Sequence, residues 1–122
     1  MATPTPRQLA LLAAEVCSDK KAKDIKILDV RKITSISDYF VICSTSNERQ
    51  ARAITDDLRI RMREIGKREL GVEGVADGRW VLQDFADIVV HVFLESQREF
   101  YDIEGLWADA KQVRWKKPSK KS

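Results

Sequence analysis

The first apolar pattern in the chain lies near the N-terminus and has the spacing of a helix. Thr5 can cap such a helix, Pro6 suits its first position, and Gln8 completes a capping box. Apolar residues then recur on one helical face: Leu9, Leu12, Ala13 and Val16. The pattern predicts an amphipathic helix that ends in the polar stretch 18–23.

Two strand patterns of different kinds follow this helix. Ile25, Ile27 and Val30 alternate with polar residues, which predicts a strand with one face buried. Residues 39–43 form a nearly continuous apolar run after a turn at residues 35–38. Such runs are typical of strands that are covered on both faces.

A second helix is predicted after residue 44. Thr45-Ser46-Asn47-Glu48 has the form of a capping box, with Thr45 or Asn47 as the cap. The apolar face consists of Ala51, Ile54, Leu58, Met62 and Ile65, and Gly66 is placed to end the helix. The opposite face carries Arg49, Arg52, Arg59, Arg61 and Arg63, interleaved with Asp56, Asp57 and Glu64. This mixture of charges is typical of a solvated surface.

The second half of the chain contains the pattern of an edge strand and a hairpin. Residues 67–72 are polar with isolated apolar positions, which favours an edge strand. After a turn at Asp77-Gly78, residues 80–85 and 88–94 form two strands joined at Ala86-Asp87. A connection this short requires an antiparallel hairpin. Four residues then predict the apolar stripe of a closing helix: Phe100, Ile103, Trp107 and Ala110.

These elements predict one α/β (α+β) domain over residues 1–112, in the order α-β-β-α-β-β-β-α. We expect a mixed sheet of about five strands with flanking helices. The central helix is placed to carry a right-handed crossover between parallel strands. Residues 113–122 are predicted to form a basic, disordered tail.

Composition agrees with a globular domain, since 34% of the residues are charged and 43% are hydrophobic. The net charge is +3, but residues 116–122 hold four lysines, so residues 1–115 carry −1. The tail lacks interleaved aromatic residues or arginines, which favours a solvated end over RNA contact. No signal peptide and no apolar run long enough to span a bilayer is found, so a cytoplasmic protein is expected.

Few residues offer metal, redox or catalytic chemistry. Cys17 and Cys43 lack CxxC spacing and resemble buried hydrophobic residues, so we expect no disulfide and a reducing compartment. His91 is the only histidine, and its place within a strand predicts a packed, hydrogen-bonded side chain. Asp84 and Asp87 flank the hairpin turn and offer paired acids for Mg²⁺.

Nucleotidyltransferase-type sites, which hold Mg²⁺ with such acids, also present a Gly-Ser turn that opens a helix. The chain contains no Gly-Ser dipeptide and reads Ser44-Thr45-Ser46-Asn47 at that place. We therefore predict no catalytic residue, no metal and no cofactor, and a protein that is not an enzyme.

The aromatic residues of the hairpin suggest a binding surface. Strand alternation places Trp80, Leu82 and Asp84 on one face of the strand. Val81, Gln83 and Phe85 lie on the other face. An exposed tryptophan beside an acid is a good anchor for a protein partner with basic and apolar groups. The predicted partner-binding residues are Arg79, Trp80, Leu82, Asp84, Phe85, Asp87 and, from the following helix, Tyr101.

Four segments carry a resemblance to a known family: DIKILDV at residues 24–30, SDYFVICSTS at 37–46 with Arg49-Gln50, WVLQDFADIVVHVF at 80–93, and REFYDIEGLW at 98–107. In this order and spacing they resemble the ribosomal silencing factor, or Iojap-like, family. Ala86 stands where that family commonly has glycine.

The resemblance implies a nucleotidyltransferase-like fold without the catalytic signature. It implies a translation repressor that binds the large ribosomal subunit through its interface protein, the fourteenth in the large-subunit naming. The bound protein would block joining of the small subunit when nutrients run short, and would form a homodimer off the ribosome. Direct RNA contact is secondary, and no membrane partner is expected.

Two alternatives from other functional classes remain open at this stage. One is a small Mg²⁺-dependent nucleotide-processing enzyme that uses Asp84 and Asp87. The other is an RNA-binding module that acts through the basic tail and the arginine face of the central helix.

Overall fold

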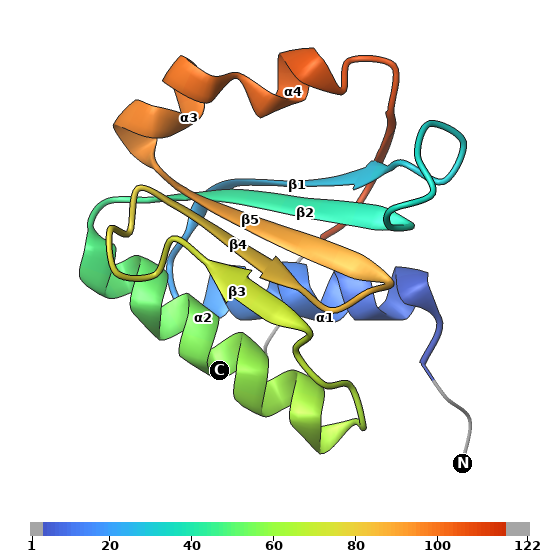
Figure 1. The fold of residues 1–122 in the computed structure, drawn as a ribbon, viewed down its shortest axis with the longest axis horizontal. Helices are drawn as coiled ribbons and strands as arrows, with labels where there is room; N and C mark the ends of the chain where they lie inside the picture. The colour runs from blue at the N-terminus through green and yellow to red at the C-terminus, as the bar shows by residue number, and fades with distance from the viewer. Residues whose placement is uncertain (1–3, 117–122) are drawn as a thin grey trace.

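A computed structural model describes residues 4–116, and Figure 1 shows its fold. The helices are α1 (Pro6–Asp19), α2 (Glu48–Glu64), α3 (Glu95–Tyr101) and α4 (Ile103–Leu106). The strands are β1 (Lys23–Asp29), β2 (Tyr39–Thr45), β3 (Gly71–Glu73), β4 (Trp80–Asp84), β5 (Ile88–Leu94) and β6 (Lys111–Val113). The predicted order is confirmed, with one additional strand at its end.

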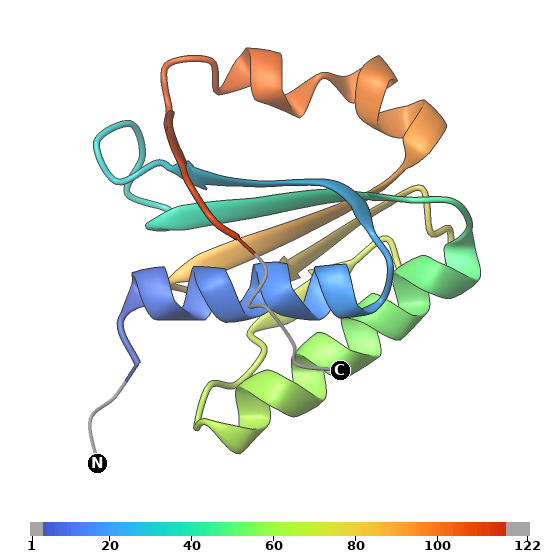
Figure 2. The ribbon, with the colours of Figure 1, turned by 180° about the vertical axis from the view of Figure 1, so that it is seen from behind.

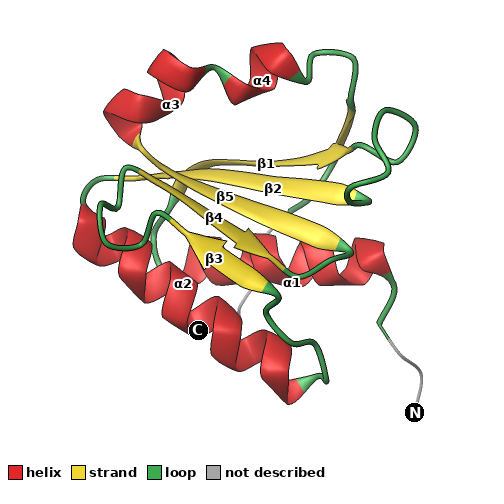
Figure 3. Ribbon diagram, in the orientation of Figure 1, coloured by secondary structure: helices red, strands yellow, loops and turns green. Residues whose placement is uncertain are grey.

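The strands form a mixed sheet in the order β3-β4-β5-β2-β1-β6, as Figure 3 shows for the central members. β2 and β5 are parallel, with Val41 opposite Val90, and every other pairing is antiparallel. Parallel neighbours require a long connection. Here α2, β3 and β4 supply it, so the predicted hairpin of β4 and β5 lies at the end of this crossover.

Helices cover the sheet on both sides. In Figures 1 and 2, α1 and α2 lie below the sheet, and the short helices α3 and α4 lie above it. We refer to the two sides as the α1/α2 face and the α3/α4 face. All seven residues of β2 are buried between them, as its continuous apolar run predicted.

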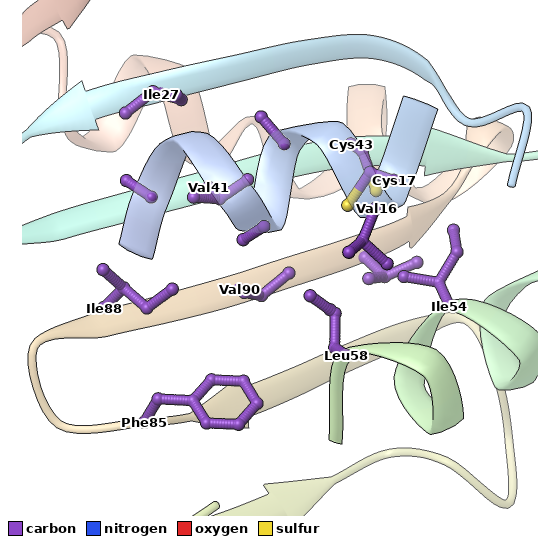
Figure 4. Close-up of a cluster of buried hydrophobic side chains, with 14 of the residues drawn as sticks. Val16, Cys17, Ile27, Val41, Cys43, Ile54, Leu58, Phe85, Ile88 and Val90 are labelled. Carbon is purple, nitrogen blue, oxygen red and sulfur yellow. The ribbon is translucent and has the colours of Figure 1, made fainter. Parts of the chain in front are cut away.

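The larger core lies on the α1/α2 face, and Figure 4 shows part of it. α1 contributes Leu9, Ala13 and Val16, and α2 contributes Ile54, Leu58 and Met62. They pack on strand residues that alternate along the sheet, among them Val41, Val81 and Val90. The predicted apolar faces of both long helices are confirmed except at Ile65, which follows the last residue of α2 and is exposed.

The smaller core lies on the α3/α4 face and is rich in aromatic residues. Its buried members are Leu28, Val30, Phe40, Ile42, Val89, Phe93 and Ile103. Trp80, Leu82 and Trp107 pack against it while remaining partly exposed. This side of the sheet is therefore less completely covered than the other.

The helix ends follow the local sequence. The capping box of α1 is formed as predicted, with Thr5 and Gln8 bonding reciprocally. For α2 the cap is Asn47, whose Oδ1 accepts from the Gln50 backbone N–H at 2.8 Å. The Thr45–Glu48 box is not formed, because Thr45 is buried in β2 and its hydroxyl donates to the Phe93 carbonyl.

The closing helix differs from the prediction. It breaks into α3 and α4 at Asp102, whose φ of +44° is left-handed. The break takes Phe100 off the predicted apolar stripe and leaves it 77% exposed, whereas Ile103 is buried. The continuous helical spacing of the apolar residues does not predict such a break.

The predicted C-terminal boundary of the domain, residue 112, lies too near the N-terminus. β6 pairs with β1, Val113 is buried, and the Trp115 indole N–H donates to the Ile25 carbonyl at 3.2 Å. The fold therefore extends past residue 112 as far as Trp115. The edge strand β3 begins at Gly71, later than expected. Residues 117–122, the remainder of the predicted tail, lie outside the described part of the chain.

Replacement of Ala86 by glycine is expected to stabilise the fold by about 1 kcal/mol. Ala86 is exposed and has a φ of +71°, a region that disfavours a side chain. The free energy of unfolding in urea measures the change. Ala53→Gly, within α2, is the control and should destabilise by about 1 kcal/mol. Equal destabilisation by both substitutions would contradict the strain at Ala86.

The two thiols are expected not to react in the folded protein. Cys17 and Cys43 are free and fully buried, and their side chains meet in the core (Figure 4). The hydrogen bond to Cys43, together with burial, raises the pKa of the Cys17 thiol well above its usual range. Labelling with a disulfide reagent at pH 8 should be negligible in native buffer and complete in denaturant. Rapid labelling of the native protein would contradict this burial.

Candidate docking surface

Strand β4 alternates between the two sides of the sheet as predicted. Val81 and Gln83 are buried on the α1/α2 face. Trp80, Leu82 and Asp84 are partly exposed on the α3/α4 face. This arrangement leaves a surface of mixed apolar and acidic character beside α3.

Trp80 is held in place by three neighbours. Its ring stacks on Phe93 at a centroid distance of 4.9 Å and lies 4.8 Å from the ring of Tyr101. Its indole N–H donates to Nδ1 of His91 at 3.2 Å. The side chain is therefore ordered before any partner arrives, which reduces the entropy lost on binding.

The backbone before Trp80 is also constrained. Gly74 has a φ of +85°, and a Cβ at this position would collide with the Trp80 carbonyl. The turn that leads into β4 therefore requires glycine here.

Exposed apolar side chains extend the surface from Trp80 onto α3, and α4 carries a further exposed apolar residue. Tyr101 is 40% exposed, and Phe100 and Leu106 are each 77% exposed. The rings of Phe100 and Tyr101 meet edge to face at 5.1 Å. The sequence analysis placed Phe100 on the apolar stripe of a continuous helix, and the break at Asp102 accounts for its exposure. Leu106 was not singled out by the sequence analysis.

His91 lies beneath this surface and is packed, as predicted. It contacts the edge of Phe40, with 4.8 Å between ring centroids, and is only 4% exposed. Because Nδ1 accepts from Trp80, the proton of the neutral ring lies on Nε2. Nε2 has no hydrogen-bond partner within residues 4–116. Burial lowers the pKa of His91 to about 4, so the ring is neutral near pH 7.

Two of the predicted rim residues, Arg79 and Phe85, differ in their exposure to solvent. Arg79 is exposed and pairs with Asp77 at 3.2 Å. Phe85, in contrast, is only 1% exposed and packs in the core of the α1/α2 face. The prediction that Phe85 contacts a partner is wrong, because strand alternation carries it to the opposite side from Trp80.

The two acids of the hairpin turn have structural roles. Asp84 Oδ1 accepts from the Ala86 backbone N–H at 2.8 Å, and Asp87 pairs with Lys67 at 2.7 Å. Within residues 4–116, no group of three or more His, Cys, Asp or Glu side chains is arranged to hold a metal ion. The geometry therefore gives no support to a Mg²⁺ site built on this pair.

Arg98 fastens α3 to the rest of the molecule. Its guanidinium donates to both carboxylate oxygens of Glu104 at 3.0 Å, to the Ser44 hydroxyl at 2.8 Å, and to the Asp24 carbonyl. The hydrogen bonds from Arg98, reinforced by Lys26, lower the pKa of Glu104. This cluster joins α3 to α4, β1 and β2. The sequence alone gave no signal for it, because an arginine on a helix usually faces solvent.

Comparison with known proteins decides the family. The model of the family described as "Ribosomal silencing factor during starvation" matches residues 3–122. This chain belongs to the ribosomal silencing factor family. Its relative named ribosomal silencing factor RsfS in Bacillus subtilis is 39% identical over 104 residues, covering 85% of this chain and 88% of that protein. The chloroplastic protein Iojap of Arabidopsis thaliana is 36% identical, covering 85% of this chain and 43% of that protein.

Two solved structures share the fold over most of their length. A crystal structure of a Chromobacterium violaceum protein matches with a TM-score of 0.81 and 36% identity, covering 98% of this chain and 92% of that one. One from Bacillus halodurans matches with a TM-score of 0.79 and 36% identity, covering 88% of this chain and 98% of that one. The family is a family of ribosome-silencing proteins and not of enzymes. No helix within residues 4–116 is long and apolar enough to cross a membrane.

The stability of the fold is expected to fall as the pH drops from 7 to 5, because of His91. The unfolded chain takes up this proton near pH 6.5, but the folded protein does so only near pH 4. Between these values the unfolded state binds more protons, so stability rises with pH. The difference amounts to about 2 kcal/mol between pH 7 and pH 5. Urea unfolding at pH 7, 6 and 5 measures it.

His91→Asn is the matched variant, since its amide oxygen can accept from Trp80 without titrating. Its stability should change little over the same interval. The lowered pKa values of Asp29 and Glu104 affect stability only at more acidic pH, where carboxyl groups titrate. If the variant and the original protein lose the same stability between pH 7 and pH 5, His91 is not the cause of the pH dependence.

Proposed function

We propose that this protein represses translation by binding the large ribosomal subunit and blocking, by its volume, the joining of the small subunit. The ordered aromatic surface on β4 and α3, in a chain of this family, is the observation that carries the proposal. No chemical step is required, since a bound body at a subunit interface excludes the other subunit. Position and affinity are therefore what matter.

The proposed docking surface consists of Trp80, Leu82 and Asp84, bordered by Arg79, Asp87 and Tyr101. Phe100, whose ring meets that of Tyr101, enlarges it. The ribosomal partner is the interface protein that is fourteenth in the large-subunit naming, as the family resemblance implies. A standard interface buries about 800 Å² on each partner, roughly a tenth of the 7584 Å² of accessible surface here.

Acidic groups beside the aromatic surface support a basic partner. A cavity of about 550 Å³ lies along α3 and is lined by Asp24, Ser44, Glu95, Arg98, Glu99, Asp102 and Glu104. Five of these seven side chains are acids. Glu104 pairs with Arg98 and Lys26, and Glu95 pairs with Lys23. Asp24, Glu99 and Asp102 form no ion pair within residues 4–116. An excess of acids along α3, the helix that also carries Tyr101, favours a partner that presents lysine or arginine near apolar groups.

The same surface is proposed to form a homodimer off the ribosome, so that dimerisation and docking compete. Covering Phe100, Tyr101 and Leu106 with a second copy would remove exposed apolar area from water. In this scheme the protein acts in the cytoplasm during nutrient limitation and stationary phase, and the free monomer is the form that binds.

Trp80→Ala is expected to weaken binding to purified large ribosomal subunits by about 2 kcal/mol, roughly thirty-fold, because it removes the central anchor. Co-sedimentation across a range of subunit concentrations measures the Kd. Ile36→Ala, at a residue 72% exposed in the loop before β2, is the control and should bind normally. Leu82→Ser is a second variant. It removes an apolar side chain of the surface without removing a ring of the aromatic stack.

Thermal unfolding confirms that each variant is folded. Unchanged affinity in folded Trp80→Ala and Leu82→Ser variants would refute this docking surface. A truncation before Lys116 distinguishes the tail: if it alone abolishes binding, the contact is electrostatic and made by the tail. If the original protein does not sediment with subunits at all, the proposed function itself is wrong.

A further inference from the structure

A second surface feature lies at the C-terminal end of α2, away from the aromatic residues. Here a cavity of about 570 Å³ is lined by Arg59, Arg63, Gly66, Lys67, Arg68 and Glu69. Four of these six residues are cationic and one is acidic. The docking surface does not use any of them.

The end of α2 beside this cavity is closed by its own backbone. The Lys67 backbone N–H donates to the Met62 carbonyl at 2.8 Å, and that of Gly66 donates to the Arg63 carbonyl at 3.0 Å. With the φ of +83° at Gly66, this is a Schellman ending. Two of the last carbonyls are therefore already hydrogen-bonded, and the positive charge at the cavity comes from its side chains and not from the helix end.

One side of the cavity is rigid. Arg59 donates to both oxygens of Glu69, at 3.1 and 3.2 Å. Glu69 also accepts from the amide of Gln83, a fully buried residue of β4, at 2.6 Å. The negative charge of Glu69 is therefore neutralised within the wall, and Arg59 has a fixed orientation.

The other side offers unused positive charge. Lys67 is paired with Asp87, whereas Arg63 and Arg68 are exposed and make no ion pair within residues 4–116. Two guanidinium groups open to one cavity match the geometry of a phosphate, which accepts paired N–H donors.

We propose that this cavity binds a backbone phosphate of ribosomal RNA when the protein is docked, with Arg63 and Arg68 as the ligands. The inference rests on the proposed function and names a second contact for it. The alternative source of the same chemistry is a free phosphate anion, which the experiment separates.

The cavity and the docking surface share one edge of the molecule. Lys67 reaches the hairpin turn through Asp87, and the Leu70 backbone N–H donates to the Asp84 carbonyl at 2.8 Å. In Figure 1 the segment after α2 turns back beside this hairpin. A partner surface that meets β4 near Asp84 therefore brings its surroundings close to the cavity. On a ribosome those surroundings are rich in phosphate.

The test is the salt dependence of binding to large ribosomal subunits by the full chain. We expect R63Q/R68Q to bind more weakly and to reduce the slope of log K against log salt by about 1 to 2. The matched control is R49Q/R52Q, which removes two exposed arginines at the other end of α2 and should leave the slope unchanged. Thermal midpoints verify that both double variants are folded.

Each outcome decides the matter. Equal slopes for R63Q/R68Q and R49Q/R52Q would overturn the RNA contact while leaving the proposed function intact, provided that the original protein binds. Inorganic pyrophosphate is the probe for a free anion: if it stabilises the original protein but not R63Q/R68Q, and subunit binding is unaffected, the ligand is a free anion and not RNA. If the original protein fails to bind subunits at low salt, both proposals fall.

Discussion

The parallel pairing of β2 with β5 is the constraint on which the rest of this structure depends. These two strands form the centre of the sheet, and nearly all of their residues are buried. Both sides must therefore be covered, and the chain must cross over from one strand to the other. α2 covers one side during that crossing, and β4 is delivered to the free edge of β5. The position of Trp80 above Phe93 is a direct result of this route.

The same centre explains why the candidate docking surface is firm. Trp80 and His91 face the same side of the sheet and are joined by a hydrogen bond, and His91 in turn packs on Phe40 of β2. A buried neutral histidine is costly to charge, but it provides an acceptor that fixes the indole. Arg98 fixes α3 from the other direction. The exposed rings are thus carried by strand β4 and by helix α3, which Arg98 anchors, and not by a loop.

Much of this fold is predictable from the sequence because the long elements have clear periods. The apolar faces of α1 and α2, the doubly buried β2 and the hairpin all follow from spacing alone. The failures occur where tertiary contacts decide. Three residues of β6 carry too short a pattern, the break at Asp102 has no preceding signal, and Arg98 resembles a solvated side chain. In the binding surface, alternation correctly separated Trp80 from Phe85, yet the rim prediction ignored it.

The two edge strands of the sheet are only three residues long. β3 ends one side and carries exposed Glu73, and β6 ends the other and carries exposed Lys111. Such short, charged edges offer little template for another strand. The apolar surface can therefore attract a partner face to face, while growth of the sheet from copy to copy into fibres is disfavoured. The short, charged edge strands therefore protect a protein with exposed aromatic rings from amyloid-like assembly.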